Sequence, residues 1–453
     1  MSSYDPLEPR KYDVILEQAR QQQSLWLRAH IRTKLPVGTR GATRYVLPVF
    51  CPMACGYLLS YLFRTINGPL ANQLITQFSL NPGSLGLLTS AYFLAFAFSA
   101  IPIGIALDGV GPRHVQGWLM AVAAVGAFAF AFAPSMLWLV VGRTLIGIGV
   151  SGGLMAGLKA NALWVSRRYL PLANGSLVMF GGLGAIAATW PVEMLDDLVG
   201  WRGTFLILAL LSSLVSVMVF ALVPDCPQDQ ELAHWRDAFS GVVKTVSNRQ
   251  FLRLAPLSAS VVGTAFAVHG LWAARWLTDI DRVSTERVVT VLLAMGIGLT
   301  VGAPLIGLVD TLLVKARIPQ SAIFATFCMA FMMLELLVVY HAHAPLALVW
   351  GLIGAFGGMT VLSYSILDSM FPAAFVGRAN SALNLLHLTT AWGVQSAMGG
   401  IIVAWTPGAS GHYPLIAYRS AFALPILLQM AAFFWFLKWN NKVRLRNGMV
   451  CTE

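Results

Sequence analysis

The chain has 453 residues, of which 57% are hydrophobic and 11% are charged, and its mean hydropathy is +0.71. Soluble domains carry about 25% charged residues, so this composition excludes an ordinary soluble protein and indicates a protein that crosses a membrane many times. The formal net charge of +11 would suit nucleic-acid binding, but the placement of the charges argues against that class. The five cysteines are scattered singly and predict neither a metal site nor a disulfide framework.

Residues 1–43 are polar and show no cleavage-site pattern of small residues, so we expect a cytoplasmic N-terminal tail rather than a secretory signal. Twelve apolar runs of spanning length follow. They lie near 45–75, 84–107, 115–133, 136–163, 175–195, 203–223, 254–277, 288–308, 320–341, 345–370, 379–404 and 414–438.

The basic residues predict the orientation of these spans. The two tails and alternate connections hold 22 of the 30 Lys and Arg residues, whereas the opposite connections hold four. Because positive charge favours the cytoplasmic side, both termini are expected in the cytoplasm. The net positive charge is then a topology signal, and no nucleic-acid partner is predicted.

The longest cytoplasmic connection, 224–253, divides the spans into two groups of six. The predicted fold is therefore an all-α membrane protein with twelve transmembrane helices in two six-helix bundles, 44–223 and 254–439. A cytoplasmic tail, 440–453, ends the chain. The expected location is the inner membrane of a cell, and the lipid bilayer is the surrounding partner.

Arg64 lies well inside the first apolar run, with no acidic residue within a helical turn. A charge at that depth costs about 2.5–3.5 kcal/mol on insertion scales, so its side chain should face a polar interior rather than lipid. Asn67 follows three positions later and is expected at the same site.

The connection between the second and third spans carries Gly104, Asp108, Gly111 and Arg113 in the spacing G-x-x-x-D-x-x-G-x-R. At this position in a twelve-span protein, the pattern resembles the signature of the major facilitator superfamily. The resemblance extends over residues 44–439. It implies that these four residues form a latch which holds helix ends together in the outward-facing state. Gly109 stands where the family often has a basic residue.

Arg143 is followed by closely spaced glycines, Gly147 and Gly149, which resemble a second signature of that family. The resemblance assigns the arginine to proton coupling or to internal polar contacts, and we include Arg143 among the candidate substrate-binding residues. The alternative is a structural arginine that binds backbone carbonyls of the first span. Both interpretations stay open at the level of sequence.

Three further side chains are candidate proton carriers. Glu193 lies at the outer end of the fifth span, where it could carry a proton, cap the helix or pair with Arg202. His269 in the seventh span and His387 in the eleventh are the other two. Asn384 lies one turn before His387, and this polar stripe should face the interior, so both residues are candidate substrate ligands.

The position of Arg64 resembles that of the carboxylate- or phosphate-binding arginine in the organic-anion branches of the superfamily, including the anion:cation symporters. Phe63 replaces an Asp that often precedes it there, and the seventh span has Phe266 where organophosphate antiporters have a second arginine. A site with a single cation, aided by Arg143, favours a small, weakly charged organic anion. A negative-inside potential opposes an entering anion by about 2.3 kcal/mol per charge per 100 mV, which favours proton co-transport.

The resulting prediction is a secondary active transporter that works by alternating access as a monomer, without cofactor, metal or catalytic residues. No G-x-x-x-x-G-K-S/T motif for ATP binding occurs in the sequence. Two alternatives remain: efflux of drugs or metabolites by proton antiport, which would need an acidic cavity, and a receptor that binds ligand without transport. An enzyme is not predicted.

Overall fold

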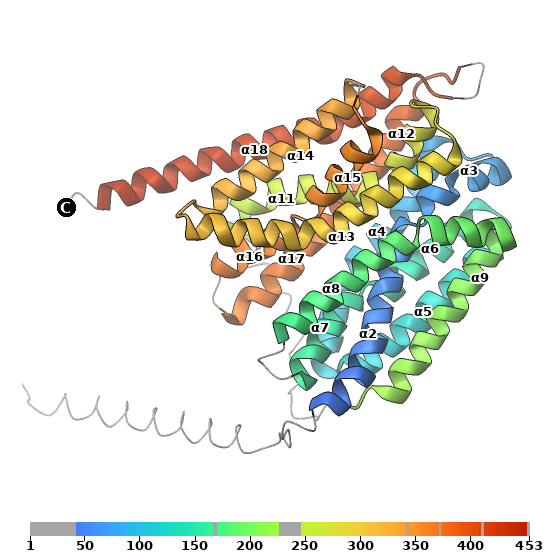
Figure 1. The fold of residues 1–453 in the computed structure, drawn as a ribbon, viewed down its shortest axis with the longest axis horizontal. Coiled ribbons are helices and arrows are strands. Elements are labelled where there is room, and N and C mark those ends of the chain that lie inside the picture. Colours follow the sequence, from blue (N-terminus) through green and yellow to red (C-terminus); the bar gives the residue numbers. More distant parts are fainter. Residues whose placement is uncertain are drawn as a thin grey trace, which may run out of the picture. The chain divides into compact units, whose positions relative to one another are not determined.

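The computed structural model describes residues 42–165, 170–225, 246–341, 344–370, 373–408 and 412–450. Regular structure within these ranges is helical throughout, as predicted (Figure 1). The chain divides into two compact units, Met1–Leu47 and Pro48–Glu453. Of the first unit, only the start of helix α2 is described, so most of the predicted N-terminal tail lies outside the described residues.

The first half of the chain forms helices that follow the predicted apolar runs. Breaks within runs coincide with residues that favour a bend, such as Gly152 before α7. The helices are α2 (Ala42–Thr65), α3 (Asn67–Phe78), α4 (Pro82–Gly109), α5 (Pro112–Ala131), α6 (Met136–Val150), α7 (Gly153–Trp164), α8 (Leu170–Ala187) and α9 (Trp190–Leu222).

The second half repeats this plan after the central connection, of which residues 226–245 are not described. A π-helical turn, η1, interrupts its first span. The elements are α11 (Arg249–Ala267), η1 (Val268–Trp272), α12 (Ala273–Asp279), α13 (Thr285–Lys315), α14 (Gln320–Val339), α15 (Leu346–Gly357), α16 (Thr360–Met370), α17 (Ala373–Val403) and α18 (Leu415–Val450).

In the described part of the chain, nine helices are long and apolar enough to cross a membrane, or ten if the bent pair α2 and α3 counts as one span. The runs predicted as the fifth and eleventh spans correspond to α8, whose apolar part is the shorter Ala173–Ala187, and to α17. The count of twelve spans, the cytoplasmic termini and the division into two bundles of six stay predictions.

Two boundaries differ from the predicted ones. The helix of the fifth span, α8, ends at Ala187. The residues from Trp190 onward belong to the next helix, α9, which bends at Gly200. Glycine suits this bend because its φ of 70° is unfavourable for other residues. The last helix continues to Val450, well beyond the predicted end near 438.

Glycines allow α5 and α6 to approach each other closely. A Cβ atom on Gly126 would lie 2.6 Å from the backbone nitrogen of Ile146, and one on Gly142 would lie 2.8 Å from that of Phe130. Since backbone atoms cannot move aside cheaply, larger residues are excluded here. Close approach of this kind is how helices associate in lipid, where no hydrophobic driving force pulls them together.

We therefore expect Gly126→Ala to destabilise the protein by about 1–3 kcal/mol, because overpacking forces the two backbones apart. Gly400→Ala is the matched control, since a Cβ there would meet no atom within 4 Å; it should leave stability unchanged or raise it by up to about 1 kcal/mol. Thermal unfolding in detergent measures both. Equal melting temperatures for the two variants would contradict the packing argument.

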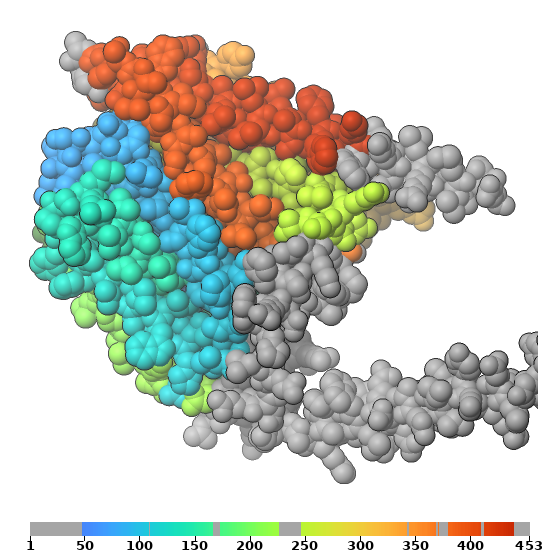
Figure 2. Space-filling view, turned by 180° about the vertical axis from the view of Figure 1, so that it is seen from behind, coloured from blue at the N-terminus to red at the C-terminus, as the bar shows by residue number. Residues whose placement is uncertain are grey.

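The two halves contact each other through α4 and α17, which lie side by side (Figure 2). A Cβ on Gly86 would be 2.9 Å from the carbonyl oxygen of Gln395, and the hydroxyls of Ser90 and Ser396 are 2.7 Å apart. These contacts involve the beginning of α4 and the end of α17, which is the end of the helices expected to face away from the cytoplasm.

Candidate functional site

Arg64 lies in the last turn of α2 with 8% of its surface exposed. Three aromatic rings surround its guanidinium carbon, at centroid distances of 4.4 Å for Tyr61, 4.7 Å for Phe266 and 5.6 Å for Phe96. Phe266 comes from α11, so the cation lies where the two halves meet. No ion pair to Arg64 is formed by the residues that the structure describes, and its Nε atom has no hydrogen-bond partner among them.

Asn67 begins α3 directly after the 47° bend that separates this helix from α2. The bend follows from the sequence Asn67-Gly68-Pro69, because proline lacks an N–H group and disfavours helical backbone before it. Asn67 is 3% exposed. Asn67 and Arg64 thus lie on either side of a break in the helix, where backbone groups are free to bind polar partners.

His269 lies in the π-helical turn η1, a form of helix that is often found at functional sites. A Cβ on its neighbour Gly270 would lie 3.5 Å from the carbonyl oxygen of Arg64, so this turn packs against the end of α2. His269 is half-buried and within electrostatic range of Arg64. This brings together two residues that are 205 positions apart in the sequence.

Asn384 and His387 lie one turn apart on α17. The Tyr364 hydroxyl donates to Oδ1 of Asn384 over 3.3 Å, and Tyr364 is in turn within electrostatic range of Arg64. His387 is completely buried, with its Nε2 atom 2.8 Å from the Ser258 hydroxyl. Among the described residues, Asn384 is therefore linked to Arg64 only through Tyr364, while His387 is held by the serine.

Arg143 is also completely buried, and its Nη1 donates to the carbonyl oxygen of Phe63 over 3.0 Å. Tyr92 and Phe130 lie 5.6 and 5.8 Å from its guanidinium carbon. This arrangement is the structural alternative left open by the sequence, in which Arg143 supports the backbone of α2 one residue before Arg64.

Glu193 lies on α9, half-buried, and its electrostatic neighbours are the carboxyl groups of Asp197, Glu286 and Asp196. The pairing with Arg202 that the sequence left open is not seen. Arg202 instead donates to the carbonyl oxygens of Ala131 and Ala133, over 2.5 and 3.2 Å.

The connection between α4 and α5 contains Gly111, whose φ of 89° explains why glycine is needed there. Arg113 donates to the carbonyl oxygen of Phe220 in the last turn of α9 over 2.7 Å, and to Asp225 just after this helix over 2.6 Å. Gly104 faces open space, and the side chain of Asp108 lies outside the described residues. The contacts of Arg113 therefore hold helix ends together within one half.

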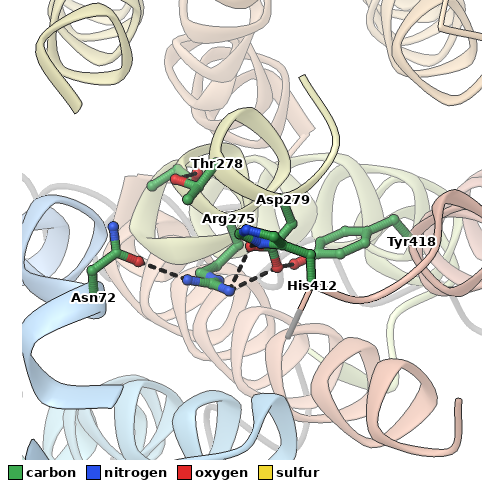
Figure 3. A network of polar contacts seen from close by, with 7 residues as sticks. Asn72, Arg275, Thr278, Asp279, His412 and Tyr418 are labelled. Atoms are coloured by element: carbon green, nitrogen blue, oxygen red, sulfur yellow. Dashed lines mark hydrogen bonds and ion pairs between the residues drawn. The ribbon is translucent and has the colours of Figure 1, made fainter. Parts of the chain in front are cut away.

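The sequence did not predict a polar cluster, centred on the buried Asp279, that links the halves (Figure 3). Arg275 donates to both carboxylate oxygens of Asp279, over 2.8 and 2.7 Å, and to Oδ1 of Asn72 in α3 over 2.8 Å. Asp279 also accepts from Tyr418 and lies 3.1 Å from Nδ1 of His412. We call these five residues the outer cluster. The i, i+4 spacing of Arg275 and Asp279 was the available signal, but only the fold adds Asn72.

A second carboxyl group lies beside the outer cluster. Asp281 is 2.8 Å from Nε2 of His341, and burial raises the pKa of this carboxyl above its usual value. Both residues belong to the second half, so this pair does not connect the two halves.

The family described as Major Facilitator Superfamily matches residues 53–389 of the chain. The chain is 31% identical over 168 residues to a probable sulfoacetate transporter, SauU, of Cupriavidus necator, and 24% identical over 199 residues to the niacin transporter NiaP of Acinetobacter baylyi. These matches cover 37% and 43% of this chain but only 38% and 42% of the two relatives. A gentisate transporter of Corynebacterium glutamicum is 22% identical over 382 residues, 81% of this chain and 84% of that protein.

Solved structures support the fold. A bacterial homologue of the human lysosomal transporter Spinster, in an inward-facing and unoccupied conformation, superposes with a TM-score of 0.67 at 18% identity, over 87% of this chain and 96% of that one. The nucleoside transporter NupG gives a TM-score of 0.68 at 15% identity, over 86% and 98%. All these relatives are named as transporters and not as enzymes. Since the family match covers most of the chain, the chain belongs to the Major Facilitator Superfamily.

Proposed function

We propose that this protein is a secondary active transporter that moves a small organic anion through the membrane, together with a proton. The environment of Arg64 supports the proposal most directly. It is a buried cation between the two halves, and no acidic side chain among the described residues neutralises it. An unpaired buried charge is costly, so an anionic ligand is the natural partner.

The ligand would lie between α2, η1 and α17. A carboxylate can bind the planar guanidinium through two parallel hydrogen bonds, which also fixes its orientation. Asn67 and Asn384 offer neutral amides on the two halves. His387 supports the wall behind Asn384, and Arg143 holds the backbone next to Arg64.

His269 is the proton carrier that the geometry favours over Glu193 and His387. The turn that carries His269 packs against the end of α2, where Arg64 lies. Like charges repel, so a bound anion that offsets the charge of Arg64 would favour a second positive charge here. Protonation of His269 therefore becomes less costly when substrate is present. This linkage would make anion and proton enter together.

We expect His269→Gln to abolish accumulation driven by a pH gradient while exchange of labelled for unlabelled substrate continues, because the anion site remains. His341→Gln is the matched control, since His341 is exposed in an outer connection. Uptake and counterflow in proteoliposomes measure the two activities. Gradient-driven accumulation by His269→Gln at the wild-type level would assign the proton to another residue, and Glu193→Gln and His387→Gln would then be compared.

Alternating access of the two halves is the proposed mechanism. In the present conformation α4 packs on α17, and the outer cluster links α3 to α12. With the orientation inferred from the basic residues, these contacts close the outer end and correspond to an inward-facing state. The latch residues Gly104, Asp108, Gly111 and Arg113 would act in the opposite state. We place the protein in the inner membrane as a monomer with cytoplasmic termini.

The experiment that tests the function is uptake into proteoliposomes of a panel of labelled organic anions, with and without a pH gradient. We expect saturable uptake of at least one anion, increased by a proton gradient in the same direction. Uptake of amphipathic cations would instead indicate drug antiport. Specific binding of an anion with no counterflow would indicate a receptor.

A further inference from the structure

We propose that the anion is a flat aromatic monocarboxylate, a class set by the rings that enclose Arg64. This inference rests on the proposed function, since it specifies the ligand of the same site. The rings of Tyr61 and Phe266 lie over the guanidinium from the two halves, at 4.4 and 4.7 Å. The Nε atom of Arg64 has no hydrogen-bond partner among the described residues, so a carboxylate can bind at that edge of the guanidinium.

The geometry of the bound pair favours a flat molecule. A carboxylate that accepts two hydrogen bonds from a guanidinium lies near its plane. A ring conjugated with that carboxylate stays close to the same plane, alongside the aromatic side chains that cover the guanidinium. A puckered ring of equal carbon number would be thicker and would lack the π-system that stacks on Tyr61 and Phe266.

The aromatic wall continues beyond these first contacts. Phe93 stacks in parallel on Phe266 with a centroid distance of 6.4 Å and an interplanar angle of 1°, and Tyr57 meets Tyr61 edge-on at 5.3 Å. The contact with Phe93 therefore holds the Phe266 ring over Arg64 in a fixed orientation, and the contact with Tyr57 does the same for the Tyr61 ring. Rings held in this way offer a preformed stacking surface.

The same surroundings disfavour small, highly polar anions and dianions. Their additional oxygens would need further donors, and a polar group buried without a partner is costly. Two polar groups on the second half, the Tyr364 hydroxyl and the Asn384 amide, already share a hydrogen bond of 3.3 Å. This pair suits one neutral hydroxyl or ring nitrogen on the ligand rather than a second negative charge.

The test measures displacement of a labelled aromatic acid, chosen from benzoate, pyridine-3-carboxylate and hydroxybenzoates, from the full-length protein in proteoliposomes. The competitors are benzoate, cyclohexanecarboxylate, propionate and phthalate. We expect benzoate to compete about ten-fold better than cyclohexanecarboxylate, the amount that one or two stacking contacts contribute. Propionate and phthalate should compete more weakly still.

Two variants identify the rings responsible. Phe266→Leu removes a ring but keeps an apolar side chain, and it should bring benzoate and cyclohexanecarboxylate to within about three-fold of each other. Phe327→Leu is the matched control, because Phe327 packs on Phe356, 5.7 Å away, and has no contact with Arg64. This control should keep the wild-type preference for benzoate over cyclohexanecarboxylate.

The results separate this inference from the proposed function. Equal competition by benzoate and cyclohexanecarboxylate, both lost in Arg64→Ala, would overturn the aromatic class and leave the anion site in place. An unchanged preference in Phe266→Leu would also overturn it. If no carboxylate binds, or if binding does not depend on Arg64, the anion transporter itself is wrong.

Discussion

Arg64→Ala is expected to weaken substrate binding strongly while leaving the protein folded. Removal of one partner from a buried, hydrogen-bonded charge pair costs about 2–5 kcal/mol, which weakens Kd roughly 30- to 5,000-fold. Arg64→Lys keeps the charge but loses the two parallel hydrogen bonds, so it should fall between Ala and wild type. Equilibrium binding in detergent and uptake into proteoliposomes measure the effect.

A second expected result concerns the stability of Arg64→Ala. Without substrate, Arg64 is a buried charge with no acidic partner in the described part of the chain, so its removal should leave the melting temperature unchanged or raise it. Arg287→Ala, at an exposed arginine in α13, is the control for loss of positive charge. Wild-type binding by Arg64→Ala, or a large loss of stability with binding retained, would contradict the role assigned to Arg64.

Asp279→Asn is expected to open the outer end of the transporter. The Asp279 side chain is completely buried and balances the charge of Arg275, which is 13% exposed. Breaking such a pair costs about 3–5 kcal/mol when the remaining charge stays buried. Opening the outer end would bring Arg275 into water and relieve that cost, so the population should shift toward the outward-facing state.

Distances between spin labels can measure this shift. Leu198 on α9 and Tyr340 after α14 are 71% and 72% exposed and belong to opposite halves. Labels at Leu198→Cys and Tyr340→Cys, in a protein without its native cysteines, should move apart in Asp279→Asn. Asn72→Ala should give a smaller shift, because it removes a single hydrogen bond worth about 0.5–1.5 kcal/mol.

Asp281→Asn is the control for this experiment, since the bond from Asp281 to His341 stays within the second half. It should leave the distance distribution unchanged. If Asp279→Asn and Asn72→Ala both keep the wild-type distances, the outer cluster supports the second half alone and does not hold the halves together.

Much of the fold could be predicted from the sequence because a membrane imposes strong and simple constraints. Apolar runs of spanning length located the helices, and the loop from Gly104 to Arg113 indicated the family that the comparison confirmed. Boundaries were less certain. Helix α9 begins at Trp190, before the predicted end of the fifth span. It also bends at Gly200, through a backbone conformation that the apolar pattern does not encode.

The candidate site was predictable only in part. The cost of a charge in lipid identified Arg64 and Arg143 as residues that must face inward, but this cost is the same for a ligand-binding arginine and a structural one. Their surroundings differ. Arg143 donates to the carbonyl oxygen of Phe63, whereas Arg64 meets Phe266 from the other half. These contacts join residues far apart in the chain, and a helical period relates only near neighbours.

The sequence by itself determined that this chain is an all-α membrane protein of a known superfamily, with a buried cation in its first span. These properties follow from composition and local spacing. The tertiary structure alone decided that aromatic rings from both halves enclose Arg64 and that Asn72 joins Arg275 and Asp279 across the halves. These contacts form where helices distant in the sequence pack together, and the geometry of that packing depends on all the side chains between them.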